Sequence, residues 1–158
     1  MQNNWIPFRL YASGWLIVLL CMVIGFEMGG SSRFLPIGAL LLASLLLHEG
    51  GHMLAARILG VPVHEFGLRL MGAYNRRSYA TRRRDEILIS AAGPGMNFLA
   101  AILFLAIPQI GAQLFICNLL LCIGNLLPLP SSDGLRILRM IRHTGTPVEI
   151  ALAMAAAR

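Results

Sequence analysis

Two histidines and a glutamate in the middle of an apolar stretch are the residues best suited to chemistry. They lie in the segment HEGGH as His48, Glu49 and His52. On a helix, side chains four positions apart project from the same face, so both imidazoles can share one ion. Zinc suits imidazole, and a catalytic zinc site uses three protein ligands and keeps one position open for water. Glu49 is then placed to act as a general base on that water.

The third ligand must come from elsewhere in the chain, and the sequence offers five candidates: His64, Glu65, Asp85, Glu86 and Asp133. Asp133 is favoured because it is the only acid beside the last long apolar stretch. Prolines before it, in NLLPLPSSDG, can end a helix and turn the chain towards the site. Gly134 permits a sharp turn after it. The alternative role for Asp133 is to cap the short helix that follows.

The composition indicates a membrane protein. The chain has 158 residues, of which 57% are apolar and 13% charged, against roughly 45 to 50% and 25% in soluble domains. So few hydrophilic side chains cannot cover a water-facing surface, and the excess apolar surface must face lipid. The thirteen basic residues outnumber seven acidic ones. They gather between apolar stretches, as in cytoplasmic loops, so we expect no nucleic-acid partner.

The apolar stretches predict an all-α polytopic membrane protein with about four transmembrane helices. We place them at residues 10–27, 35–59, 87–107 and 111–127. The first could instead be a cleaved signal peptide. Residues 87 to 132 carry no formal charge, and a straight helix of that length would reach about 69 Å, roughly twice the hydrocarbon core. This stretch must therefore fold back near Pro108.

Two shorter elements are expected outside these helices. Alternating side chains over residues 63–71 predict a short strand or β-hairpin-like segment associated with the membrane. Residues 134–143 combine arginine with leucine and isoleucine, which is typical of a short amphipathic helix. Arginines in the 69–84 loop and the 136–142 segment fall on one side of a four-helix arrangement, so both termini should be cytoplasmic. Ends of the second and fourth helices then lie at similar depth.

Three motifs together resemble the site-2 protease family of intramembrane zinc metalloproteases. HEGGH in an apolar helix is followed by AAGPGMN at 91–97 and by NLLPLPSSDG, which ends at residue 134. The resemblance implies that His48, His52 and Asp133 bind Zn²⁺ and that Glu49 activates water. It also implies that Asn125 and Asn97 line or support the site.

By the same resemblance, residues 1–158 form a single membrane-embedded metalloprotease core in a lipid bilayer, as in a bacterial cytoplasmic membrane. The substrate would be a transmembrane protein or peptide, cut in or near its membrane segment. We expect a minimal member without PDZ or CBS modules. The 63–71 segment would hold extended substrate by edge pairing, or be a surface loop without substrate contact.

The glycines near the motifs are the main departure from the family. Gly50 stands where the family usually has a larger apolar residue, and two adjacent glycines should loosen the helix by roughly 1 kcal/mol each. This holds unless another backbone packs closely there. We also expect Gly93 and Gly95 to allow close helix approach around Pro94.

Two other functions remain open from the sequence. One is a non-catalytic metal-binding membrane scaffold, suggested by the small size and by Gly50. The other is an ion or proton carrier in which His48 and Glu49 relay protons. Ionisable groups at this depth persist mainly where they are paired or functional, and no internal repeats typical of carriers are visible.

Overall fold

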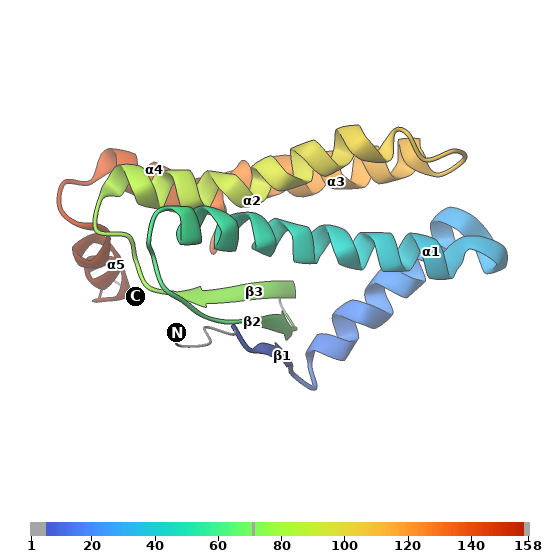
Figure 1. The fold of residues 1–158 in the computed structure, drawn as a ribbon, viewed down its shortest axis with the longest axis horizontal. Coiled ribbons are helices and arrows are strands. Elements are labelled where there is room, and N and C mark those ends of the chain that lie inside the picture. The colour runs from blue at the N-terminus through green and yellow to red at the C-terminus, as the bar shows by residue number, and fades with distance from the viewer. Residues whose placement is uncertain (1–5, 71, 157–158) are drawn as a thin grey trace.

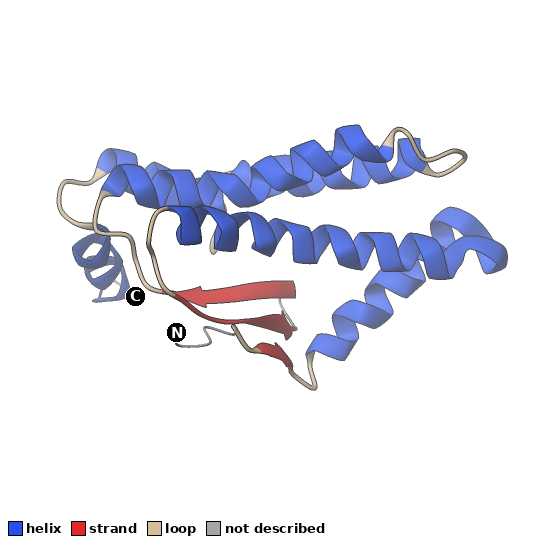
Figure 2. Cartoon of the chain, viewed as in Figure 1, coloured by secondary structure: helices blue, strands red, loops and turns tan. Residues whose placement is uncertain are grey.

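The computed structural model describes residues 6–70 and 72–156 and is mostly helical (Figure 1). In chain order its elements are β1 (Phe8–Leu10), α1 (Gly14–Ile58), β2 (Val63–Arg69), β3 (Gly72–Arg77), α2 (Arg83–Phe104), α3 (Gly111–Leu126), α4 (Asp133–Arg142) and α5 (Pro147–Ala156). Helices α2 and α3 and the second part of α1 run along the long axis, and a small sheet lies beside α1 (Figure 2). The prediction of a helical fold with a β-hairpin-like segment is confirmed in part, and an additional strand, β1, completes a three-stranded sheet.

The first two predicted helices form the two arms of α1. The helix folds back sharply at Gly30, which has φ 64° and ψ −171°. That conformation is open almost only to glycine. The arms pack closely, since a Cβ on Gly25 would lie 2.5 Å from the carbonyl oxygen of Phe34. The break predicted over several residues is thus confined to a single glycine.

The remaining predicted helices appear with shifted ends. The third begins four residues earlier than expected, at Arg83, and its first turn contains Asp85 and Glu86. Acidic side chains are favourable there because the helix dipole is positive at its start. The fold-back near Pro108 is present, and Gln109 adopts φ 69° within it.

Among the described helices, α1 and α2 are long and apolar enough to cross a membrane, and α3 is a shorter apolar helix. Four transmembrane helices are not confirmed by these criteria. The arginine-rich segments do meet at one end of the molecule, where Arg83 of α2 donates a hydrogen bond to the carbonyl of His143 at 2.7 Å. Residues 1–5 and 157–158 lie outside the described part, so the cytoplasmic placement of both termini stays a prediction.

The sheet has the order β1-β2-β3. The predicted strand is confirmed over residues 63–69 as β2, which pairs antiparallel with β3 and places Phe66 opposite Asn75. Residue 71, the last of the predicted segment, lies outside the described residues. On its other side β2 pairs parallel with β1, with Phe8 opposite Phe66. A Cβ on Gly67 would overlap the carbonyl oxygen of Arg9, so glycine is required for this approach.

A buried ion pair attaches the sheet to α2. Both terminal guanidinium nitrogens of Arg77 donate to the carboxylate of Glu86, at 2.9 and 2.7 Å. The backbone N–H of Ala80 donates to the same carboxylate at 3.0 Å. Both side chains are nearly inaccessible to solvent. The end of β3 is therefore fixed against the start of α2.

Candidate metal centre

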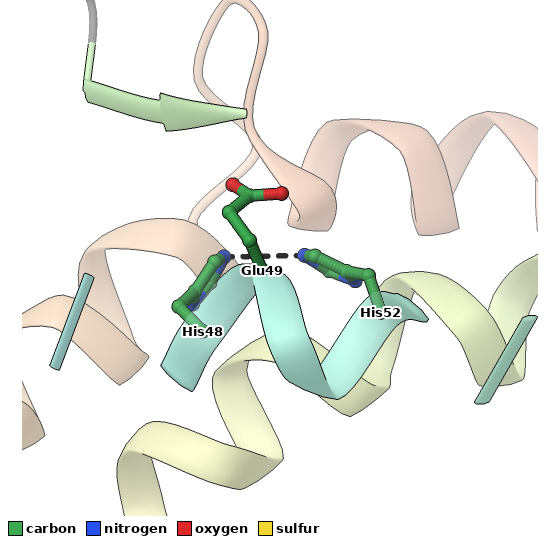
Figure 3. Close-up of side chains that lie close together, drawn as sticks. All are labelled: His48, Glu49 and His52. Atoms are coloured by element: carbon green, nitrogen blue, oxygen red, sulfur yellow. Dashed lines mark hydrogen bonds between the residues drawn. The ribbon is translucent and has the colours of Figure 1, made fainter. Parts of the chain in front are cut away.

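Three side chains from two distant parts of the chain converge at one point. His48 and His52 lie one turn apart on α1, and their Nε2 atoms are 3.2 Å apart (Figure 3). Asp133, the first residue of α4, places Oδ2 3.1 Å from Nε2 of His48 and 3.3 Å from that of His52. All three residues are buried. The structure thus brings together the three residues suggested as ligands.

The hydrogen bonds at the other ring nitrogens decide the tautomers of the histidines. Nδ1 of His48 is 2.6 Å from Oδ1 of Asn97, and Nδ1 of His52 is 2.7 Å from the carbonyl oxygen of Ile89. Carbonyl oxygens only accept hydrogen bonds, so we assign the ring proton of each histidine to Nδ1. In the neutral rings, both Nε2 atoms then present lone pairs to the carboxylate.

This cluster has the size and chemistry of a zinc site. Two imidazole lone pairs and a carboxylate oxygen in mutual contact need a positive charge between them. At zinc–ligand distances of about 2.0 to 2.2 Å, neighbouring ligands of a tetrahedral site are roughly 3.3 Å apart. The three measured separations are 3.1, 3.2 and 3.3 Å. The residues present therefore fit Zn²⁺ with one coordination position left over.

The carboxyl of Asp133 is held in its charged form. Burial acts to raise its pKa, but when the two imidazoles are protonated, their Nε2–H groups and positive charge outweigh burial and hold the pKa well below the ordinary value. Beside neutral imidazoles, whose Nε2 atoms carry lone pairs, a bound cation would take the place of that charge. Capping is not its role, because Ser132 is the N-cap of α4 and its hydroxyl accepts from the N–H of Leu135 at 3.1 Å. Gly134 is required next to it, since a Cβ there would overlap the carbonyl oxygen of Leu126.

The structure does not bring the other candidate ligands to the histidine pair. His64 is exposed and hydrogen-bonds Ser78 at 3.0 Å. Glu65 accepts from Tyr74 and pairs with Arg9 at 3.1 Å, and these contacts lower the pKa of its carboxyl. Glu86 belongs to the ion pair with Arg77, and Asp85 lies in the first turn of α2.

Glu49 lies on the wall of a large cavity. The cavity measures about 820 Å³ and is lined by α1, β3, the end of α3 and the segment before α4. Figure 3 shows the Glu49 carboxylate pointing away from α1, beside the two imidazoles. Ligand atoms of His48, Glu49 and His52 lie within 4.8 Å of one another. Asp133 is closer to the pair, and Glu49 is instead hydrogen-bonded to Asn75 of β3.

The two predicted supporting asparagines occupy different positions. Asn97 is fully buried and contacts His48, while its amide donates to the carbonyl of Ser44 and to Asn118 at 3.2 and 3.1 Å. Asn118 was not predicted, although an asparagine within an apolar helix indicates a hydrogen bond to a neighbouring helix. Asn125 lies on the cavity wall, and its amide donates to the carbonyl of Leu121 in its own helix.

The glycine predictions are half right. Close packing occurs at Gly51, where a Cβ would lie 2.5 Å from the carbonyl oxygen of Ala92, whereas Gly50 faces open space. A Cβ on Gly93 would overlap the imidazole of His52. Gly95 has no atom within 4 Å of that position, so the expectation for it is wrong. The close approach of α1 and α2 thus depends on Gly51 and Gly93.

Comparison with known proteins finds a family match over the middle of the chain. The model of peptidase family M50 matches residues 37–112, which include the HEGGH segment. The chain is 31% identical over 147 residues to a zinc metalloprotease of Methanocaldococcus jannaschii. That alignment covers 86% of this chain and 42% of the relative. The chain therefore spans less than half the length of this curated relative.

A solved structure shows the same fold. The site-2 protease from Methanocaldococcus jannaschii superposes with a TM-score of 0.68 at 28% identity, covering 89% of this chain and 69% of that one. An HExxH segment that faces a distant aspartate is the residue pattern of a zinc metalloprotease site. Residues 37–112 thus match peptidase family M50, and the fold of the chain is similar to that of a site-2 protease.

Proposed function

We propose that this chain is an intramembrane zinc-dependent endopeptidase. It would hydrolyse a peptide bond in or near a transmembrane segment of another membrane protein. The observation that carries the proposal is the triangle formed by the Nε2 atoms of His48 and His52 and Oδ2 of Asp133, with sides of 3.1 to 3.3 Å. This triangle and Glu49 both border the 820 Å³ cavity.

The proposed roles follow from the position of each side chain. His48, His52 and Asp133 hold the zinc ion, and Asn97 orients His48. Bound zinc supplies Lewis acidity, polarising the scissile carbonyl and lowering the pKa of water. Glu49 accepts the proton of the attacking water as the new C–O bond forms. It then returns that proton to the amide nitrogen as the C–N bond breaks.

We further propose that four apolar segments cross the membrane: the two arms of α1, then α2 and α3. Support comes from leucines exposed along these helices, such as Leu19, Leu103 and Leu120, which would face lipid. The end that carries Arg83 and Arg136 would face the cytoplasm by the positive-inside rule. The protein would then reside in a bacterial cytoplasmic membrane with the metal centre below the cytoplasmic surface.

The substrate would bind in the cavity as an extended segment. A transmembrane helix conceals its peptide bonds in backbone hydrogen bonds, so it must unwind before hydrolysis. β3 lies at an edge of the described sheet and also lines the cavity. An unwound segment can therefore add to this edge by backbone pairing.

The test separates metal binding from catalysis. Glu49→Gln should retain one zinc per chain and lose cleavage of a co-expressed reporter, whose single apolar helix lies between two epitope tags. Asp133→Ala should lose both zinc and cleavage. Undiminished cleavage by Glu49→Gln would refute the proposal. Wild-type zinc binding without cleavage of any such reporter would favour the non-catalytic scaffold.

A further inference from the structure

The side chain of Asn75 on β3 touches the proposed general base. Its amide nitrogen donates a hydrogen bond to Oε2 of Glu49. Among the described residues, no hydrogen bond is made to the other oxygen, Oε1. Both residues are partly buried and line the same cavity. Asn75 was not predicted as a site residue, since nothing in its surroundings along the chain indicates a partner in α1.

A glutamate on a cavity wall needs an external contact to hold one orientation. Its side chain has three rotatable bonds, and a general base must lie within about 2.6 to 3.2 Å of the proton that it accepts. The neighbouring histidines are held by Asn97 and by the carbonyl of Ile89, both on α2. The contact with Asn75 is the equivalent support for Glu49.

Asn75 is itself held on two sides. It pairs with Phe66 across the β2–β3 ladder. Two residues further on, Arg77 is fixed to Glu86 of α2 by the buried ion pair. Since α2 also orients both histidines, one helix sets the position of the metal ligands and, through β3, that of Glu49.

We propose that Asn75 is a positioning residue for Glu49. By holding Oε2, its amide leaves Oε1 directed to the reactants, so that the proton is taken up on Oε1. This inference rests on the proposed function, in which Glu49 is the general base. According to this inference, the sheet helps to orient the catalytic carboxylate of Glu49.

Kinetics provide the first test. Asn75→Asp keeps the size of the side chain, replaces the donor by an acceptor and places a like charge beside Glu49. We expect kcat for the tagged helical reporter to fall by a factor on the order of a hundred. KM should change by less than about threefold and zinc content should not change. Asn75→Gln, which keeps the amide, should recover part of the loss.

The control variant is Ser78→Ala, one residue beyond β3, whose hydroxyl contacts His64 and not the site. It should retain wild-type kcat. If Asn75→Asp keeps wild-type kcat, or if it loses zinc together with activity, the proposal is overturned. Loss of kcat in both Asn75→Gln and Ser78→Ala would also overturn it, because general disturbance of the strand would then explain the effect.

A second test does not depend on activity. In zinc-free protein labelled with ¹⁵N-asparagine, the side-chain amide of Asn75 is assigned by its disappearance in Asn75→Ala. Glu49→Ala should shift this resonance, and an unchanged resonance would reject the contact. If Glu49→Gln cleaves normally, the proposed function fails. If Glu49→Gln is inactive while Asn75→Asp has wild-type kcat, only the present inference fails.

Discussion

At the scale of single residues, hydrogen bonds to Nδ1 decide what the histidine pair can bind. Asn97 accepts from His48 and thereby leaves Nε2 unprotonated in the neutral ring. The same asparagine is anchored by Ser44 and Asn118. A fully buried polar residue in an apolar helix is therefore explained by a contact with a proposed ligand, and helix packing alone does not account for it.

We predict that Asn97→Ala weakens zinc binding by roughly 10- to 100-fold, because the ring of His48 loses the contact that fixes its tautomer. Asn97→Asp should bind zinc more tightly than the alanine variant, since a carboxylate oxygen can also accept from Nδ1. Competition with a chromophoric chelator measures both affinities. Equal affinities in wild type and Asn97→Ala would show that Asn97 does not orient His48.

Gly93 and Gly95 offer a matched pair of substitutions. A Cβ at residue 93 would overlap the imidazole of His52, whereas a Cβ at residue 95 meets no atom within 4 Å. Gly93→Ala should therefore displace the imidazole, reduce zinc content and destabilise the fold by about 1 to 3 kcal/mol. Gly95→Ala should bind zinc normally and gain up to about 1 kcal/mol of helix stability. Zinc analysis and thermal unfolding in detergent distinguish the two. Full zinc occupancy in Gly93→Ala would contradict this packing.

At the scale of elements, the attachment of the sheet to α2 rests on one buried ion pair. Glu86→Ala leaves the guanidinium of Arg77 buried without its partner, and we expect a loss of about 3 to 5 kcal/mol in the free energy of unfolding. Replacing both residues, as Arg77→Met with Glu86→Leu, should cost less than the single change. Thermal unfolding of the two variants in one detergent measures the difference. A double variant less stable than Glu86→Ala would show that the charges themselves stabilise the fold.

The helices could be predicted because each is an apolar stretch that ends at charges or turn residues. Predicted and observed ends of the third and fourth helices differ by a few residues at most, and Gly30 marks the fold-back that separates the arms of α1. β1 could not be predicted in this way. Its three residues become a strand only by pairing with β2, more than fifty positions along the chain.

The residues of the site likewise fall into those that the sequence could predict and those that depend on tertiary contacts. The spacing of His48 and His52 on one helix was sufficient to place both imidazoles together. Asp133 was favoured among five candidates from its place after the last long apolar stretch, but its approach to the histidines depends on the contact of Gly134 with the end of α3. Asn75 had no signal in the sequence, because its contact with Glu49 depends on the register of β3 against α1.

At the scale of the whole molecule, the proposed zinc ion would connect α1 directly to α4, two helices that both pack against α2. His48 of α1 and Asp133 of α4 are 85 positions apart in the chain. Both helices pack on α2, and the ligand atoms meet where the three helices converge. Without a cation, lone pairs from two imidazoles face a carboxylate, an arrangement that opposes close packing.

Zinc should therefore stabilise the folded chain as a whole. With free zinc at about 1,000 times its dissociation constant, we expect the free energy of unfolding to rise by about 4 kcal/mol. This rise corresponds to an increase of roughly 10 °C in Tm for a chain of this size. Removal of zinc by a chelator should lower Tm by this amount, and added zinc should restore it. Asp133→Ala should melt at the same temperature with and without chelator, because its site is incomplete. Glu49→Gln should respond to the chelator as the wild type does, since Glu49 is not a ligand in this arrangement. A chelator response that persists in Asp133→Ala but disappears in Glu49→Gln would assign the third ligand to Glu49 and remove α4 from the metal centre.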